Sequence, residues 1–500
     1  MSFKNLKMTL NNNTEFKNSN HLTEVLKQNK TLFISAGVTA LLWLLFAVNI
    51  ALLVLNLNSS LSWYFKNLIK INGFTLLIWT VVTFFSAIVS TYATNYLKGF
   101  KYHSRFMLLC LAFTASVMFL VMSNHILLFL GSWLLMGVIM SQLIGIDKNW
   151  GEAKEASKFA LKYFLSGSLF LTLGVLLLAF YSNKFTIDGL SEVADKLPQY
   201  ITIPSVFLVI AASLVQSAIY PFHRWLLSAM TAPTPASALM HAGFVNGAGI
   251  LLTLFAPLLF ASNLLTILFV VGGLTAIIAQ FTKLLQINVK QKLACSTIAQ
   301  MGFMIMQCGL GFFNAAVVHL ILHGFYKAYL FLSSNEEVQQ SLPKKPTKLK
   351  IIPIQAILVI VFGTLGAVLF TIWTGKGIQT NSGVFLTLIV AITVGQATYN
   401  IVKEQSLSTF QKISVPALLF IIGIGVYALF YKGVSVLMAS MPMIQNPMPL
   451  SWPQIIFGVL FLIGFFIMKL EVYKKIPWLY VKLLNISQPY AKTVLMYKLK

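Results

Sequence analysis

Long apolar segments separated by short polar ones occupy almost the whole chain. A helix needs about 20 apolar residues to cross a bilayer, and fourteen segments approach or exceed that length. They are residues 31–55, 71–93, 106–122, 124–145, 158–181, 201–219, 231–256, 262–280, 290–312, 314–333, 351–373, 383–401, 413–431 and 453–468. This pattern predicts an all-α, polytopic membrane protein with about 14 transmembrane helices.

The composition agrees with the hydropathy pattern. Hydrophobic residues make up 58% of the 500 residues and charged residues only 10%, whereas charged residues account for about 25% of a soluble domain. The net charge is +24, but the basic residues stand mostly between apolar segments. Because anionic lipid headgroups explain such a placement better than nucleic acid does, we expect membrane lipids and no nucleic acid as partners.

The distribution of Lys and Arg predicts the orientation in the membrane. With a cytoplasmic N-terminus, 28 of the 36 basic residues fall on the cytoplasmic side, six fall on the outer side, and Lys162 and Lys327 lie within spans. Basic residues accumulate on the cytoplasmic side of membrane proteins. We therefore expect both termini in the cytoplasm, with residues 1–30 forming a polar tail and residues 469–500 a basic tail.

A basic run stands out in one of the predicted cytoplasmic loops and consists of Lys344, Lys345, Lys348 and Lys350. It has two interpretations, a headgroup-binding loop that fixes topology or a docking surface for a soluble partner. Polybasic segments beside a membrane attract anionic lipids, which favours the first interpretation.

The sequence carries no catalytic or metal-binding pattern that we recognise. Cys110, Cys295 and Cys308 lack the spacing of metal ligands, and no nucleophile stands beside a general base. We therefore expect no catalytic residue, no metal site and no cofactor in this chain, and no covalent catalysis by this chain alone.

The first stretch with candidate chemistry covers residues 213–250. Pro221, Pro233 and Pro235 interrupt it at membrane depth, and proline breaks helices because it lacks a backbone donor. Irregular backbone is tolerated within a membrane where it lines a polar cavity. The stretch, which includes His223, therefore predicts a discontinuous helix beside a cavity. A kinked helix next to an ordinary loop is the alternative.

His241 lies within the next predicted span. A lone buried histidine often does no more than bind a backbone carbonyl, whereas ionisable groups inside a membrane usually mark an ion path. Both interpretations of His241 are open from its position alone.

The strongest candidate is the segment 319–331, which contains His319, His323 and Lys327. Their spacing of four residues places them on one face of a helix, over about 12 Å. Placing a lysine at mid-membrane is costly, and burial makes it release its proton more readily, beside histidines that titrate near neutral pH. The row predicts a proton relay, and a structural polar stripe between packed helices is the alternative.

A third polar stretch lies in residues 290–312. Ser296 and Gln300 are suited to hydrogen-bond neighbouring helices or to hold water, whereas Lys290 at its start is expected to anchor the helix. Lys162, near the end of its own span, is expected to extend to the membrane interface.

These stretches resemble the antiporter-like membrane subunits of proton-pumping NADH dehydrogenase and of multisubunit sodium/proton antiporters. The likeness covers about residues 100–335 and is carried by Pro221, Trp225, PTPASALMHA ending at His241, STIAQMGF and HLILHGFYK. It implies two inverted five-helix repeats with discontinuous helices. It also implies a central hydrophilic axis that is made of His241, His319, His323 and Lys327.

The resemblance suggests a division of the chain into five parts. These are the polar tail 1–30, N-terminal accessory helices 31–105, an antiporter-like core 106–401, C-terminal accessory helices 402–468 and the basic tail 469–500.

Two positions depart from the family pattern. The family has a glutamate after an early core tryptophan, where this chain has Leu134 after Trp133, and a lysine where this chain has Gln216. The resemblance implies that this glutamate and lysine are partners, and the loss of both strands no buried charge. The charge switch of the first half of the core is therefore expected to be absent. No Lys, Glu or Asp falls within the last four predicted spans.

These departures, and a C-terminal segment too short for the long lateral helix of respiratory subunits, make the chain most similar to DabB-type membrane subunits of two-component inorganic-carbon transporters. The resemblance implies a subunit in the bacterial plasma membrane that conducts a cation, proton or sodium, and energises uptake of CO₂ or bicarbonate. It implies a large soluble, zinc-binding, carbonic-anhydrase-like partner at the cytoplasmic face. A subunit of a cation/proton antiporter or of a proton-pumping NADH-quinone oxidoreductase is the alternative.

Overall fold

The computed structural model describes residues 31–57, 62–334, 353–377, 379–402, 407–469 and 472–494. Its long helices are Thr31–Leu57, α2 (Gly73–Tyr96), α3 (His103–Met122), α4 (Ile126–Ile144), α5 (Gly151–Ser182), α7 (Gln199–Gln216), α12 (Leu265–Leu284), α13 (Val289–Gly309), α14 (Phe313–Leu332), α16 (Pro353–Thr374), α17 (Gly383–Val402), α18 (Thr409–Leu437) and α19 (Trp452–Lys469). The shorter elements are β1 (Trp63–Phe65), β2 (Ile69–Ile71), α6 (Ile187–Glu192), η1 (Ala194–Lys196), α8 (Arg224–Ser228), η2 (Ala229–Thr231), α9 (Thr234–Ala242), η3 (Phe244–Asn246), α10 (Gly247–Leu254), α11 (Ala256–Ala261), η4 (Val472–Lys475), α20 (Pro477–Ile486) and η5 (Ala491–Thr493).

The helices confirm the predicted membrane fold. Each predicted span coincides with one long helix, except that the seventh is divided between α9 and α10. Twelve segments among the described residues are long and apolar enough to cross a membrane. The protein is therefore an all-α, multi-span membrane protein. The predicted N-terminal tail and the basic run near residue 348 lie outside the described residues.

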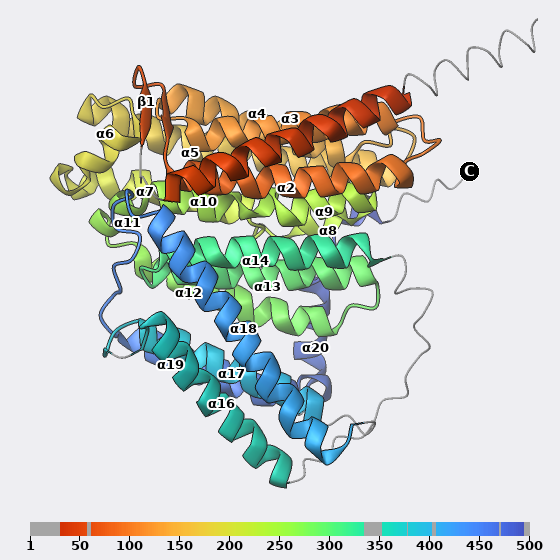
Figure 1. Ribbon diagram of the computed structural model, residues 1–500, viewed down its shortest axis with the longest axis vertical. Coiled ribbons are helices and arrows are strands. Elements are labelled where there is room, and N and C mark those ends of the chain that lie inside the picture. The colour runs from red at the N-terminus through yellow and green to blue at the C-terminus, as the bar shows by residue number, and fades with distance from the viewer. Residues whose placement is uncertain are drawn as a thin grey trace, which may run out of the picture.

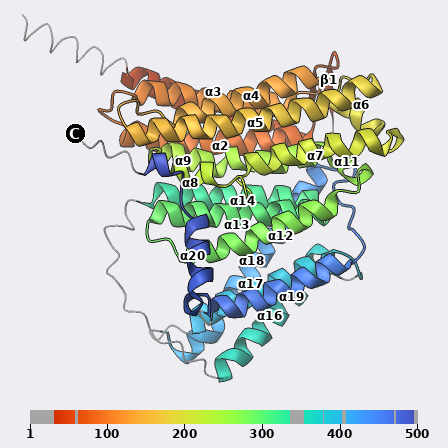
Figure 2. The same ribbon diagram turned by 180° about the vertical axis from the view of Figure 1, so that it is seen from behind.

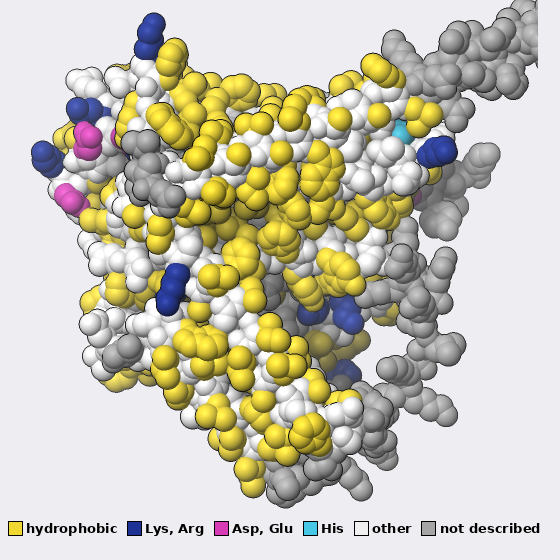
Figure 3. Space-filling view, viewed as in Figure 1, with side chains coloured by type: hydrophobic (Ala, Val, Ile, Leu, Met, Phe, Trp, Pro, Cys, Tyr) yellow, Lys and Arg dark blue, Asp and Glu magenta, His cyan; other side chains and the backbone are white. Residues whose placement is uncertain are grey.

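The long helices from α2 to α14 run roughly parallel, so that their ends form two opposite faces, whereas α16 and α18 lie at a slant to them (Figure 1). One face carries the β hairpin, α6 and α11, and we call it the hairpin end. The opposite face carries α20, which crosses the ends of the bundle nearly at right angles to it, and we call it the α20 end (Figure 2). Hydrophobic side chains cover most of the surface between these ends on the face shown in Figure 3, as expected for contact with lipid.

Two parts of the bundle are joined by α18. The first part contains α2 to α14, and the second contains α16, α17 and α19 (Figures 1 and 2). α18 contacts α16 and α17 in the second part and α14 and α2 in the first. This connection keeps the second part against the helix that carries the predicted relay.

A small β hairpin is an exception to the helical fold. β1 pairs antiparallel with β2, with Trp63 opposite Ile71. Lys66 and Asn67 in the turn both adopt positive φ, a conformation that tight hairpin turns require. Ile69 also bridges to Ser123, so the hairpin is fixed to the end of α3.

The predicted helix interruptions are present, but the prolines do not cause all of them. α7 ends at Gln216, and Pro221 lies in the turn before α8. Pro233 and Pro235 occupy the start of α9, where proline is tolerated because the first helical N–H groups have no partner in the helix. The break inside the following span comes at η3, after Gly243, and contains no proline.

The C-terminal segment from η4 to η5 packs on the core, although the sequence suggested only a basic tail. The Nε2 of His223 bonds to the carbonyl of Ile486 at 2.8 Å, and the backbone N–H of Tyr490 donates to the Ser228 hydroxyl at 2.9 Å. The Tyr490 ring stacks on Phe159 with centroids 4.3 Å apart. These contacts fix the segment, which contains α20, to α5 and to α8.

Candidate functional site

The row on α14 is buried in the centre of the bundle. His323 is 5% exposed and Lys327 is 0% exposed. The rings of His319 and His323 are nearly parallel, with centroids 6.1 Å apart. The Lys327 amine donates to the main-chain carbonyl of Leu293 on α13 at 3.1 Å. The spacing of four residues thus places the three side chains on one face, as predicted.

His241 joins this row from a different helix. It is fully buried at the end of α9, and its ring stacks on Phe331 of α14 with centroids 4.3 Å apart. The two helices are in close contact there, since a Cβ added to Gly324 of α14 would lie 3.1 Å from the carbonyl oxygen of Ala242. The structure therefore brings together all four predicted relay residues, which we refer to as the His–Lys row.

Several nitrogens of the row are available for proton exchange. Both ring nitrogens of His241 and of His323, and Nε2 of His319, have no hydrogen-bond partner within the described part of the chain. Buried polar atoms are normally satisfied by protein or by ordered water, so this arrangement suits a path in which water links the side chains. In the described residues no three His, Cys, Asp or Glu side chains form a group suited to a metal ion.

Asn246 is a part of the site that the sequence did not single out. Its amide nitrogen donates to the carbonyls of Ala242, at 2.7 Å, and of Leu320, at 3.2 Å. It therefore bonds one carbonyl beside the break at η3 and one carbonyl of α14, and so ties that break to α14. Its Oδ1 has no partner among the residues described. The signal available in the sequence was a polar asparagine three residues after Gly243, within a predicted span.

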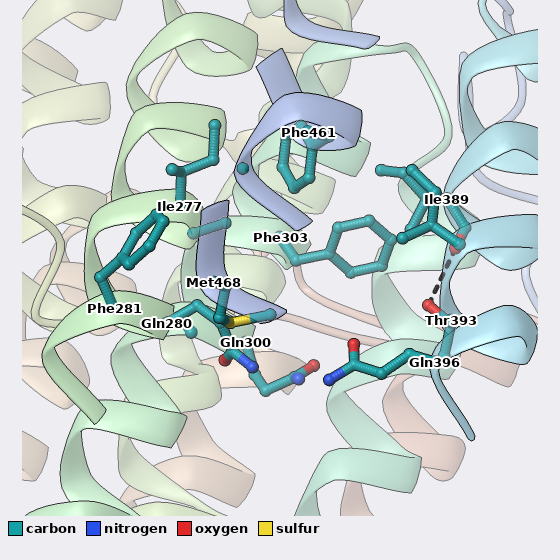
Figure 4. Close-up of a pocket in the computed structure, with 14 residues that line it drawn as sticks. Ile277, Gln280, Phe281, Gln300, Phe303, Ile389, Thr393, Gln396, Phe461 and Met468 are labelled. Carbon is teal, nitrogen blue, oxygen red and sulfur yellow. Dashed lines mark hydrogen bonds between the residues drawn. The ribbon is translucent and has the colours of Figure 1, made fainter. Parts of the chain in front are cut away.

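The remaining predicted cavity residues have different surroundings. Gln216 is 3% exposed and donates to the carbonyl of Phe244 in η3 at 3.1 Å, so it holds two helix breaks together. His223 lies beneath the C-terminal segment and not beside the row. Ser296 is buried on α13, and Gln300 lines a cavity between α12, α13, α17 and α19 (Figure 4).

The two departures from the family pattern lie in different environments. Leu134 is 41% exposed on α4, whereas Gln216 is buried. A carboxylate at the first position would therefore project from the surface of this chain. Replacing Leu134 alone would not strand a charge inside the bundle.

Lys376 is a buried cation that the sequence placed in an ordinary outer loop. It lies between α16 and α17, yet it is only 3% exposed. Its amine sits 3.8 Å from the ring centroid of Tyr431 and 4.7 Å from that of Phe312, and it has no hydrogen-bond partner among the described residues. The aromatic faces attract the ammonium group and offset part of the cost of its burial.

Lys376 is expected to make stability depend on pH. Burial lowers its pKa from 10.5 to about 7. Below pH 7 the amine is charged in the folded and unfolded chain, and the full burial cost opposes folding. As pH rises above 7 the folded protein releases the proton, and the cost shrinks until it disappears above the ordinary lysine pKa. We expect Lys376→Met to raise the midpoint of thermal unfolding more at pH 6 than at pH 9.

Lys432→Met is the matched control for this measurement, because Lys432 is an exposed lysine on α18. The difference in unfolding midpoint between Lys432→Met and the wild type is expected to be the same at both pH values. If Lys376→Met raised the unfolding midpoint equally at both pH values, the burial of the Lys376 charge would not control stability.

The chain is similar in sequence and in fold to known membrane subunits. Residues 123–350 match the family described as NADH:quinone oxidoreductase/Mrp antiporter, TM. A probable inorganic carbon transporter subunit DabB of Bacillus anthracis is 35% identical over 311 residues, which cover 60% of this chain and 59% of the relative. NADH-ubiquinone oxidoreductase chain 5 of Allomyces macrogynus is 34% identical over 303 residues, which cover 59% of this chain and 47% of that protein.

The solved structure of the Mrp complex from Dietzia sp. DQ12-45-1b contains a chain of the same fold. The TM-score is 0.64 at 20% identity, and the match covers 93% of this chain and 58% of that one. The chain thus spans only about half to three-fifths of the length of the curated relatives described.

Proposed function

Because this chain belongs to the antiporter-like superfamily of membrane subunits, we propose that it conducts a cation to energise the uptake of inorganic carbon. Relatives in Bacillus and Halothiobacillus that are named as probable inorganic carbon transporter subunits support this choice of substrate. We place the protein in the plasma membrane of a bacterium. The activity is transport, and no covalent step is assigned to this chain.

The His–Lys row is the observation that carries the proposal. Four titratable side chains from α9 and α14 meet in the membrane interior. Placing each of them there costs free energy, and such residues usually mark the path of an ion or proton. The described spanning helices contain no carboxylate except Glu152 and Glu155 at the start of α5. Imidazole and amine groups exchange protons, whereas hard cations prefer oxygen ligands. We therefore propose the proton, and not sodium, as the coupling ion.

We assign the α20 end to the cytoplasm, in agreement with the positive-inside pattern. Arg224 and Lys482 line an open groove there together with Trp478, which is 68% exposed. A large soluble, zinc-binding subunit that resembles carbonic anhydrase would dock at this end and would hold the zinc. Its role would be to convert or deliver CO₂ or bicarbonate while the proton moves through the His–Lys row.

A growth experiment tests the proposed function. Deletion of the gene is expected to prevent growth in air and to leave growth in elevated CO₂ unchanged, because CO₂ then enters by diffusion. Uptake of labelled bicarbonate should collapse with a proton ionophore and persist when sodium is replaced by potassium. A growth defect that added CO₂ or bicarbonate does not relieve would contradict the proposal.

A subunit of a cation/proton antiporter or of a proton-pumping NADH-quinone oxidoreductase is the second candidate. It is favoured by the relative among NADH-ubiquinone oxidoreductases and by the family description. In that case the deletion would impair sodium tolerance or NADH oxidation in membranes at every CO₂ level. A translocase activity would then belong to the whole complex.

A further inference from the structure

Two cavities lie side by side within the membrane-spanning part of the protein. The first has a volume of about 370 Å³ and lies between α12, α13, α17 and α19 (Figure 4). The second has a volume of about 450 Å³ and lies between α13, α14, α16, α17 and α18. Phe303, Ile389 and Thr393 line both of them, so the two cavities meet at these side chains. Each is as large as a typical site for a small organic ligand, about 300–1,000 Å³.

The first cavity combines an apolar wall with amide groups. The polar side chains among its described lining residues are Gln280, Gln300, Thr393 and Gln396. Figure 4 shows the amides of Gln300 and Gln396 turned toward one another, with Phe303, Phe461 and Ile389 to one side of them. Amides both donate and accept hydrogen bonds. The lining therefore suits a molecule with an uncharged hydrogen-bonding head and a larger apolar body.

The second cavity contains buried polar atoms that point to a ligand. Gln307 is 3% exposed, and its Oε1 has no hydrogen-bond partner among the described residues. Nε2 of His319, which lines the same cavity, is unpartnered in the described part of the chain as well. Among the described residues no charged side chain lines either cavity. The charge of a phosphate or carboxylate head would therefore have no partner there.

The cavities adjoin the His–Lys row. Phe303 separates the first cavity from His319, and the two rings have centroids 5.3 Å apart. The helices that enclose the cavities are weakly buried, with 28% of the apolar window of α17 and 17% of that of α18 inside the protein. A molecule dissolved in the bilayer can therefore approach from the lipid side without crossing the core.

We propose that the joined cavities form a binding site for an uncharged lipid that carries a hydroxyl head, of the monoacylglycerol type. The head hydrogen-bonds the amides of Gln300 and Gln396, and the acyl chain lies along Phe303 and Ile389. Because Phe303 contacts His319, the bound lipid restrains that ring and slows conduction. The binding site does not depend on the proposed function of the chain, since occupancy is measured without any transport.

Photolabelling of the full-length protein in proteoliposomes tests this site. The probe is a monoacylglycerol with a diazirine in its acyl chain, and the comparison probe is the phosphate ester of the same molecule. Labelled peptides are expected to come from α13 and α17 with the uncharged probe. Gly464→Leu should reduce this labelling about tenfold, equivalent to about 1.4 kcal/mol. Gly464 lines the first cavity, and a Cβ added there meets no atom within 4 Å, so the leucine side chain has open space to occupy.

Gly433→Leu is the matched control, because Gly433 lies on α18 outside both linings and its Cβ also meets no atom within 4 Å. Its labelling should equal that of the wild type. The double variant Gln300→Leu/Gln396→Leu should lose the uncharged probe but retain one with an alkane tail and no head, whereas Thr364→Val on exposed α16 should retain both.

Two results would overturn the proposal. Equal labelling of the wild type and Gly464→Leu would mean that the probe reacts from the surrounding bilayer, and equal labelling by the phosphate ester would contradict an uncharged head. Addition of the unlabelled lipid should also slow cation flux in the wild type and not in Gly464→Leu. If no flux exists at all, the proposed function fails, while the labelling result still decides the binding site.

Discussion

Replacement of Lys327 by alanine is expected to abolish cation flux and carbon uptake while the protein accumulates at its normal level. Lys327 is fully buried, and it supplies the amine of the His–Lys row. A positioned acid–base group commonly contributes about 10²- to 10⁴-fold to a proton-transfer step. We therefore expect flux in proteoliposomes to fall at least about a hundredfold.

Two further variants separate the role of the charge from that of packing. Lys327→Met keeps most of the volume of the side chain and should be as inactive as Lys327→Ala. Lys162→Ala removes an exposed lysine from α5 and should leave flux unchanged. If Lys327→Met conducted as well as the wild type, the row would be a structural stripe and the proton relay would be wrong.

Replacement of Gly73 by alanine is expected to cause a large loss of stability. Gly73 begins α2, and a Cβ there would overlap the carbonyl oxygen of Leu437 at the end of α18. The atoms of Leu437 at this contact belong to the backbone. The end of α18 therefore cannot make room for the Cβ by changing a side-chain rotamer. Overpacking of this kind costs about 1–3 kcal/mol and occasionally more. A lower unfolding midpoint in detergent, and less folded protein in membranes, would be the measured result.

Gly131→Ala is the control for this substitution. Gly131 lies on the exposed side of α4, and an added Cβ meets no atom within 4 Å. Alanine favours a helix over glycine by about 1 kcal/mol, so this variant should be neutral or slightly more stable. Similar losses for both variants would contradict the close contact between α2 and α18.

The predicted relay shows how far the spacing of residues along the sequence can predict a site. His319, His323 and Lys327 share one helix, and the period of 3.6 residues places them on one face without further information. His241 lies 78 residues before His319 in the chain, so no spacing rule could bring it to Phe331. Only the resemblance to a family linked His241 to the row, and the stacking of the two rings shows how they meet.

Lys376 shows the opposite case. Two glycines flank it in a short connection between helices, and a lysine in such a loop is normally solvated. Its burial depends on Phe312 and Tyr431, which belong to the start of α14 and to α18. Neither residue is near Lys376 in the sequence, so hydropathy could not distinguish this lysine from the other loop lysines.

The sequence by itself determined the positions of the long apolar helices and the row on α14. This is possible because a bilayer offers no hydrogen bonds, so each crossing segment must be an apolar helix that satisfies its own backbone. The tertiary structure alone decided the break at η3, the docking of the C-terminal segment, the burial of Lys376 and the cavities lined by Gln300 and Gln396. These features arise from packing between helices that are distant in the chain, and packing depends on side-chain shape in three dimensions rather than on local composition.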